Sequence, residues 1–184
     1  MAESASRNFS KKLIEIDISS DTVCPWCFVG KKNLDKAIDA SKDQYNFENL
    51  EINLQIFKGI GLEYDTSGLT GNTLDSHRLI HYTGKQAPEK QHSLVEELCL
   101  GYFTQGKYIG DREFLAETAK KLGIDGAEVF LSDPSNGTTE VKEELEKYSQ
   151  NITGVPHYTI NGKVKLSGAQ PPETFQSAFE AASS

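Results

Sequence analysis

Alternating apolar and polar residues near the start of the chain predict a strand that leads directly into a helix. From Leu13 to Ser19 an isoleucine occupies every second position, which is typical of a β-strand with one buried face. From Cys27 to about Ser41 the apolar residues recur at roughly helical spacing. The chain therefore opens with a strand followed by a helix.

The middle of the chain predicts one further strand and then a block of helices. Residues Leu50 to Phe57 alternate again and fit a second strand, although so short a run also fits a helix. A glycine-rich loop follows, and then come segments with apolar stripes and helix-ending residues. These helical segments are 73–84, 88–106, 111–123 and 138–151. Pro88 stands in the first turn of its segment, where proline is favoured. Asp111 suits an N-cap, and Gly123 suits the end of a helix.

The C-terminal part predicts a β-hairpin and a last helix. The short runs 157–160 and 163–168 flank Asn161-Gly162, a strong hairpin signal. A helix over 171–182 completes the order β-α-β, helices, β-β-α. We predict an α/β fold in which residues 12–57 and 151–184 form one domain, with an all-helical subdomain inserted over 58–150.

Charge and hydropathy limit the classes of partner and the location that we expect for the protein. The 184-residue chain carries a formal net charge of −8 with scattered lysines, which argues against a nucleic-acid partner. No apolar run reaches transmembrane or signal-peptide length, so we expect no membrane partner and a cytoplasmic location. Structural disulfides are rare in that compartment, so a close cysteine pair there is typically catalytic or metal-binding.

The chain has such a pair, Cys24-Pro25-Trp26-Cys27, at the junction of the first strand and helix. A thiol attacks a disulfide as its thiolate, which the amides and dipole of a helix N-terminus stabilise. This placement assigns Cys24 as the attacking nucleophile and Cys27, one turn further in, as the resolving thiol. Pro25 suits the first helical position, and Trp26 is expected to give apolar contact to a substrate.

Two other interpretations of the pair stay open: half of a zinc site, or two inert buried thiols. Zinc needs two further ligands, and Cys99 and the four histidines form no second pair at ligand spacing. We therefore predict no metal. Cys99 lies on an apolar helical face and is expected to be a core thiol.

A second candidate feature, Gly154-Val155-Pro156, stands immediately before the 157–160 strand. Proline has no amide for a ladder, so it is expected at the edge or the first residue of a strand. His157 follows it, either as a proton-transfer group beside the thiols or as an ordinary strand histidine.

These features together resemble a known family. The motifs "DTVCPWCFVGKKNLDKAI", "YFTQGKYIGDREFLAETAKKLGI" and "ITGVPHYTINGKVKLSGAQPPETF" are similar to the DsbA-like, FrnE-type branch of the thioredoxin fold. That branch carries an inserted helical subdomain and is related to kappa-class glutathione transferases and 2-hydroxychromene-2-carboxylate isomerases. The resemblance implies that Pro156 is cis and faces the cysteines, shaping the groove and keeping metals off the thiolate. It also implies that the Val155 backbone pairs with substrate.

The resemblance implies a dithiol–disulfide oxidoreductase that acts on protein or small-molecule thiols and disulfides. It needs no cofactor beyond the Cys24–Cys27 pair, with glutathione as a possible reductant. The glutathione-using relatives typically carry serine where this chain has Cys24, which favours dithiol exchange. The alternatives are a glutathione-dependent isomerase or transferase, and a non-catalytic redox-sensing module or splice variant.

The sequence departs from the family pattern after the first helix. The family usually has an extended segment, a proline-rich loop and a further helix there, whereas this chain runs almost directly into its glycine-rich loop. We therefore predict that an internal segment is missing. If residues 50–57 do not replace the lost strand, the sheet is expected to be one strand short.

Overall fold

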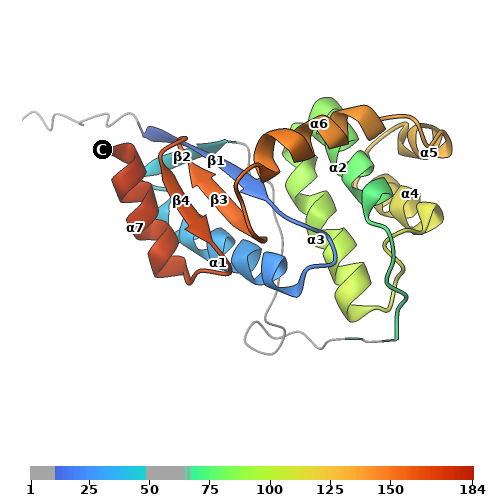
Figure 1. Cartoon of the computed structure of the whole chain (residues 1–184), viewed down its shortest axis with the longest axis horizontal. Helices are drawn as coiled ribbons and strands as arrows, with labels where there is room; N and C mark the ends of the chain where they lie inside the picture. Colours follow the sequence, from blue (N-terminus) through green and yellow to red (C-terminus); the bar gives the residue numbers. More distant parts are fainter. Residues whose placement is uncertain (1–10, 49–64, 66) are drawn as a thin grey trace, which may run out of the picture.

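The computed structural model describes residues 11–48, 65 and 67–184. A four-stranded sheet, in the order β2-β1-β3-β4, lies at one end of the molecule (Figure 1). Its strands are β1 (Lys12–Ser19), β2 (Tyr45–Glu48), β3 (His157–Ile160) and β4 (Val164–Ser167). β1 runs parallel to β2 and antiparallel to β3, and β3 is antiparallel to β4. The predicted α/β class is confirmed.

Helices α1 and α7 accompany the sheet, and five more form the other half of the molecule (Figure 1). The helices are α1 (Pro25–Ser41), α2 (Leu74–Gln86), α3 (Pro88–Thr104), α4 (Arg112–Lys121), α5 (Ala127–Ser132), α6 (Thr138–Ser149) and α7 (Pro172–Ser183). The sequence predicted all of these except α5, which is six residues long. None of the helices among the described residues is long and apolar enough to cross a membrane.

Local sequence signals explain where several elements begin and turn. The side chain of Asp111 accepts a hydrogen bond from the Glu113 amide at the start of α4, as its N-cap position predicted. Asn161 and Gly162 have φ values of 48° and 66°, the left-handed conformation that a tight hairpin turn requires at both central positions. The predicted β3–β4 hairpin is therefore confirmed with its turn.

The described residues contain a strand upstream of the one predicted over 50–57. Residues 45–48 form β2 and pair with the beginning of β1, while the predicted strand over 50–57 falls outside the described residues. The described sheet thus has a parallel strand beside β1 that does not depend on residues 50–57. The division into 12–57 with 151–184 and an inserted 58–150 stays a prediction.

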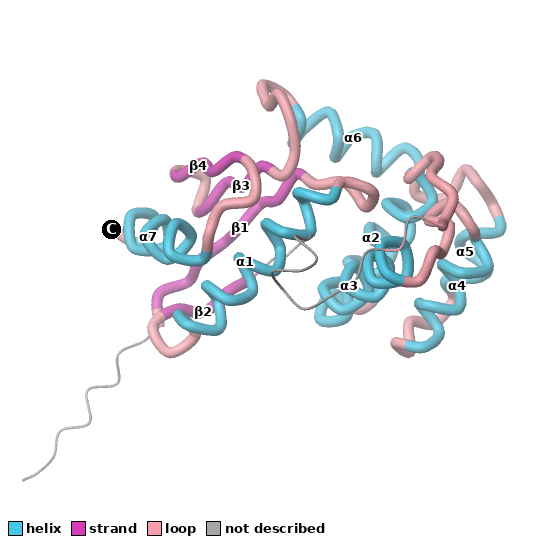
Figure 2. Tube along the Cα trace, turned by 90° about the horizontal axis from the view of Figure 1, so that it is seen from below, coloured by secondary structure: helices cyan, strands magenta, loops and turns pink. Residues whose placement is uncertain are grey.

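Two hydrophobic cores meet at α1. In the core between the sheet, α1 and α7, Leu34 and Ala37 pack with the buried residues of β1 and β3. In the helical core, Cys27 and Phe28 pack with α2, α3 and α4, and the Phe28 ring stacks on Phe103 at 5.7 Å between centroids. Figure 2 shows α1 running between the sheet and the helical half. One helix therefore fixes the position of both halves around the cysteine motif.

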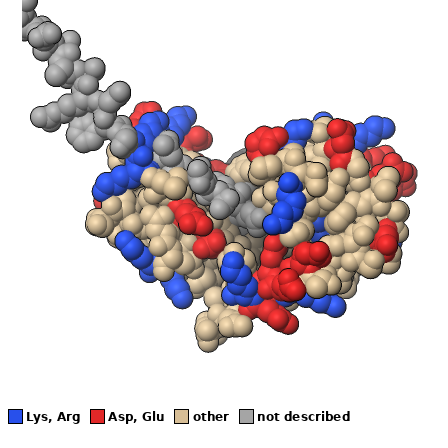
Figure 3. Space-filling model, turned by 90° about the horizontal axis from the view of Figure 1, so that it is seen from above, with Lys and Arg blue, Asp and Glu red and all other residues tan. Residues whose placement is uncertain are grey.

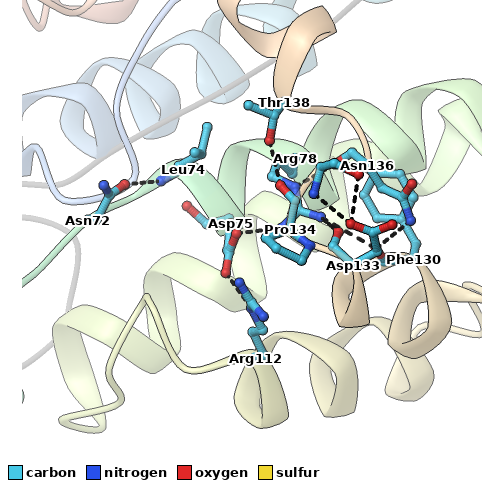
Figure 4. A network of polar contacts seen from close by, with 12 residues as sticks. Asn72, Leu74, Asp75, Arg78, Arg112, Phe130, Asp133, Pro134, Asn136 and Thr138 are labelled. Carbon is cyan, nitrogen blue, oxygen red and sulfur yellow. Dashed lines mark hydrogen bonds and ion pairs between the residues drawn. The ribbon is translucent and has the colours of Figure 1, made fainter.

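A buried arginine joins α2 to the segment that leads into α6 (Figure 4). Arg78 is 0% exposed, and its guanidinium donates to Asp75 and to the backbone carbonyls of Asp133 and Asn136. Asp75 also accepts from Arg112 of α4 at 2.6 Å. Arg78 therefore ties α2 to the loop before α6, and Asp75 ties α2 to the start of α4.

Candidate functional site

The cysteine motif sits at the end of β1, on the first turn of α1. Cys24 occupies the N-cap position and Pro25 the first helical position, as predicted. Cys24 is partly exposed, whereas Cys27 is 0% exposed and packs into the helical core. The buried hydroxyl of Thr22, 2.9 Å from that of Ser76, ties the loop before the motif to α2. The sequence therefore places one thiol at the surface and its partner behind it.

The environment of Cys24 favours its thiolate. A hydrogen bond from the Cys27 thiol, together with the amides of Cys27 and Trp26, lowers the pKa of Cys24 from 9.0 to about 6. Burial and the carboxylate of Asp21 act in the opposite direction. Burial raises the pKa of Cys27, so this thiol keeps its proton while Cys24 is ionised. The two sulfurs thus have the unequal acidities that a nucleophile and a resolving thiol need.

This difference predicts the pH dependence of alkylation. Since only the thiolate reacts with iodoacetamide, the rate at Cys24 should rise as the pH increases through about 6 and level off above it. Mass spectrometry after brief labelling measures this rate at Cys24. Replacing Cys27 with alanine removes the hydrogen-bond donor and should shift the midpoint upward. A midpoint near 9.0 in the unmodified protein would contradict this assignment.

The Val155–Pro156 peptide bond is cis, as the family resemblance predicted. It faces the cysteine motif: the Cys24 Sγ lies 3.8 Å from the carbonyl oxygen of Val155. Pro156 is buried, and its carbonyl accepts from the Gly168 amide at 2.8 Å, which fixes it to the end of β4. The structure thus brings Cys24, Cys27, Val155 and Pro156 together from opposite ends of the chain.

Gly30 allows the loop with Pro156 to approach α1 closely. A methyl carbon at position 30 would lie 1.9 Å from the Tyr158 hydroxyl oxygen and 3.2 Å from the Pro156 Cγ. The hydroxyl of Tyr158 is buried without a hydrogen-bond partner in the described part of the chain. A glycine inside a helical pattern is a sequence signal for such a close approach.

Replacing Gly30 with alanine should therefore lower the free energy of unfolding by about 2 kcal/mol, since the methyl group overpacks the contact with Tyr158. Denaturant titration measures the change. Adding Tyr158→Phe removes the nearest atom and should recover part of the loss. Gly154→Ala is the matched control, because nothing lies within 4 Å of the added methyl group. Equal losses at positions 30 and 154 would contradict the packing argument.

The remaining predicted site residues differ in exposure and in their contacts. Pro25 and Trp26 are exposed beside Cys24, with Trp26 58% accessible. Val155 is 36% exposed and its carbonyl oxygen lies next to the Cys24 sulfur. The ring of His157 points elsewhere: its Nδ1 is 2.9 Å from the Ser167 hydroxyl on β4, and burial followed by Lys165 lowers its pKa. The structure does not join this ring to the thiols.

A cavity of about 450 Å³ lies beside the end of β1 and the loop that leads to the motif. The end of β1, α2, α6 and the segment before β3 line it, and it shares Asp21 and Val155 with the surroundings of Cys24. Sequence analysis did not identify this cavity. Its walls come from segments far apart in the chain, so no local pattern marks it.

Sequence analysis also missed a buried ion cluster between α1 and α3. The Lys31 side chain is 0% exposed, and its Nζ lies 2.7 Å from Asp35, 2.9 Å from His92 and 3.1 Å from Glu96. Lys32 pairs with the same Glu96 carboxylate. Among the residues that the structure describes, no group of three or more histidine, cysteine or acidic side chains could hold a metal ion.

Comparison with known proteins identifies the family. The probable DsbA oxidoreductase SCO1869 of Streptomyces coelicolor has a similar structure, with a TM-score of 0.76 and 26% identity over 92% of this chain and 89% of that one. A structure from Nitrosomonas europaea, 13% identical, gives a TM-score of 0.69 over 93% of this chain and 97% of that one. YwbO of Bacillus subtilis (strain 168), an uncharacterized protein, is 22% identical over 90% of this chain and 96% of its own.

These matches span nearly the whole chain, and the predicted thioredoxin fold with helical content is confirmed. Placement in the FrnE-type branch and a missing internal segment stay predictions. Residues 15–180 match the family of DSBA-like thioredoxin domains, and the chain belongs to that family.

Proposed function

We propose that the protein is a dithiol–disulfide oxidoreductase in which Cys24 attacks and Cys27 resolves. The observation that carries this proposal is the partly exposed Cys24 sulfur at the N-terminus of α1, with its pKa lowered to about 6, facing the cis Val155–Pro156 bond. The similarity to a probable DsbA oxidoreductase supports the same chemistry.

Thiol–disulfide exchange uses these residues in two steps. The Cys24 thiolate attacks one sulfur of a substrate disulfide, forms a mixed disulfide, and the other substrate sulfur leaves as a thiolate that takes a proton from water. Cys27 then loses its proton and attacks the Cys24 sulfur, releasing the second substrate thiol. The products are one Cys24–Cys27 disulfide and two substrate thiols, and the reverse sequence oxidises a dithiol substrate.

Each neighbouring residue has a role in this scheme. Hydrogen bonds from Cys27 and the first-turn amides stabilise the Cys24 thiolate, both before attack and when it is a leaving group. The Val155 carbonyl, next to the Cys24 sulfur, is placed to accept a hydrogen bond from the substrate backbone. Trp26 and Val155 are exposed and provide apolar contact to the substrate near the sulfur. A cysteine at position 24 supports dithiol exchange over glutathione transfer.

The test is the reduction of insulin disulfides with dithiothreitol as the terminal reductant. The protein should accelerate this reaction, and its oxidised form should be two hydrogen atoms lighter by intact mass, with the lost hydrogens assigned to Cys24 and Cys27 by peptide mapping. A protein that forms the Cys24–Cys27 disulfide but turns over neither insulin nor a small disulfide would refute the enzymatic assignment.

A further inference from the structure

The cavity beside the thiols has the dimensions of a small-molecule site. At about 450 Å³ it falls within the range of ligand pockets, and it begins where the surroundings of Cys24 end. Asp21 and Val155 belong to both. The cavity and the surroundings of Cys24 are therefore neighbours, as a disulfide with one sulfur at Cys24 and a short substituent in the cavity requires.

The charged lining of the cavity is acidic. Asp17, Asp21 and Glu144 line it, and its lining includes neither lysine nor arginine among the described residues. Figure 3 shows acidic side chains gathered where the two halves of the molecule meet, on one face of the protein. Glu144 also pairs with His81, whose Nδ1 lies 2.8 Å from the carboxylate.

Besides His81, two basic groups lie near these carboxylates, His77 and Lys147. His77 lines the cavity, and burial lowers its pKa even though Asp21 and Glu144 act to raise it, so the ring is neutral near pH 7. Its ring has no hydrogen-bond partner within the described residues and can accept one from a ligand. Lys147 lies outside the lining and donates to the Tyr148 hydroxyl at 2.7 Å; its exposed ammonium interacts with Asp17 and Glu144 through solvent.

The rest of the lining is about half apolar, and its other members carry hydroxyl, amide or imidazole groups. The aliphatic side chains come from β1, α2, α3, α6 and the segment before β3, and they are those of Ile16, Ile18, Leu74, Ile80, Val95, Val141, Leu145, Ile152 and Val155. Apolar walls with a few acidic groups are complementary to a short alkyl chain that ends in an ammonium group.

We propose that this cavity binds the alkylammonium arm of a small aminothiol disulfide while the disulfide sulfur lies at Cys24. The proposal rests on the dithiol–disulfide function above and names its preferred substrate class. Cys24 attacks the sulfur that carries the bound arm, one aminothiol leaves, and Cys27 releases the second. The substrate is reduced to two aminothiols and the enzyme is oxidised to the Cys24–Cys27 disulfide.

Three small disulfides of similar size test the proposal: cystamine, which is cationic, 2-hydroxyethyl disulfide, which is neutral, and 3,3′-dithiodipropionate, which is anionic. The rate of oxidation of the reduced protein by each is divided by the rate of the same disulfide with 2-mercaptoethanol, which removes intrinsic reactivity. The normalised rate should be about tenfold higher for cystamine than for the neutral disulfide, and lowest for the anion. Added salt should reduce this preference.

Matched variants test whether the carboxylates of the cavity cause the preference for cystamine. Glu144→Gln and, separately, Asp17→Asn should each lower the normalised cystamine rate about threefold without changing the rate of the neutral disulfide. Glu146→Gln removes the same charge from α6 at a position that does not line the cavity, and should leave the preference intact.

The results of these experiments distinguish failure of the aminothiol proposal from failure of the proposed oxidoreductase function. Equal normalised rates for the three disulfides, all dependent on Cys24, would overturn the aminothiol assignment and leave dithiol exchange in place. If both Glu144→Gln and Asp17→Asn keep the preference for cystamine, the cavity is not the cause of that preference, and the proposal is wrong. Absence of reaction with every disulfide would refute the proposed function itself.

Discussion

Replacing Cys24 with serine is expected to reduce insulin turnover by about a thousandfold or more, because removal of a nucleophile leaves only residual catalysis. A serine hydroxyl is not ionised near neutral pH and forms no disulfide, so neither step of the exchange can begin. The measurement is the rate of insulin reduction with dithiothreitol, compared at equal concentrations of folded protein.

Two further substitutions make this result specific. Cys27→Ser leaves the first attack possible but removes the resolving thiol, so a mixed disulfide at Cys24 should accumulate and be visible by mass spectrometry. Cys99→Ala is the control, since Cys99 is buried in the helical core and should not enter the exchange. Turnover by Cys24→Ser at a rate near that of the unmodified protein would show that another group is the nucleophile.

Lys31→Met should lower the free energy of unfolding by about 3 kcal/mol, the lower end of the cost of removing one partner from a buried ion pair. The Lys31 ammonium lies within 3.1 Å of Asp35, His92 and Glu96, and its side chain is fully buried. Methionine keeps the apolar stem and removes the charge, which leaves the two carboxylates between α1 and α3 without their central cation.

Denaturant titration of Lys31→Met beside Lys42→Met tests this prediction. Lys42 is also on the α1 side, but its side chain is 67% exposed and 3.6 Å from Asp39, so its loss should cost less than about 0.5 kcal/mol. Similar losses for the two variants would contradict the assignment of stability to the buried cluster.

The same cluster sets a pH dependence for the difference between wild type and Lys31→Met. Burial acts to raise the pKa of Glu96, but Lys31 and Lys32 outweigh it and lower the pKa below 4.5. A carboxylate with a lowered pKa stabilises the folded state above its unfolded pKa and loses this contribution as the pH falls. The difference in unfolding free energy between the two proteins should therefore narrow at acidic pH, as Glu96 becomes protonated in both folded proteins.

Elements with strong local patterns could be predicted from the sequence. The alternating isoleucines of β1, the Asn161-Gly162 turn and the capped helix α4 each depend on residues adjacent in the chain. The position of Cys24 at a helix N-terminus follows from the same kind of signal. The cis Pro156 required the family resemblance, because a proline before a strand is compatible with either isomer.

Other features depend on residues distant in the sequence. The strand β2 is only four residues long. Its pairing with β1 identifies it better than any alternation of apolar and polar residues in so short a run. Helix α5 is six residues long and follows Gly126, whose φ is 75°, so it gives little periodicity to detect. Lys31 stands in a stretch that is typical of a solvated helix face, and only the approach of α3 makes it a buried charge.

The placement of α1 between two cores has a consequence for how substrates reach the thiols. Cys27 and Phe28 are anchored in the helical half while Leu34 and Ala37 are anchored against the sheet, so the two halves cannot separate without breaking a core. Within the residues that the structure describes, the cysteine motif is therefore held by both cores. Under the proposed function, we therefore expect disulfides on small molecules or flexible peptide segments to react faster than disulfides held rigid inside a folded protein.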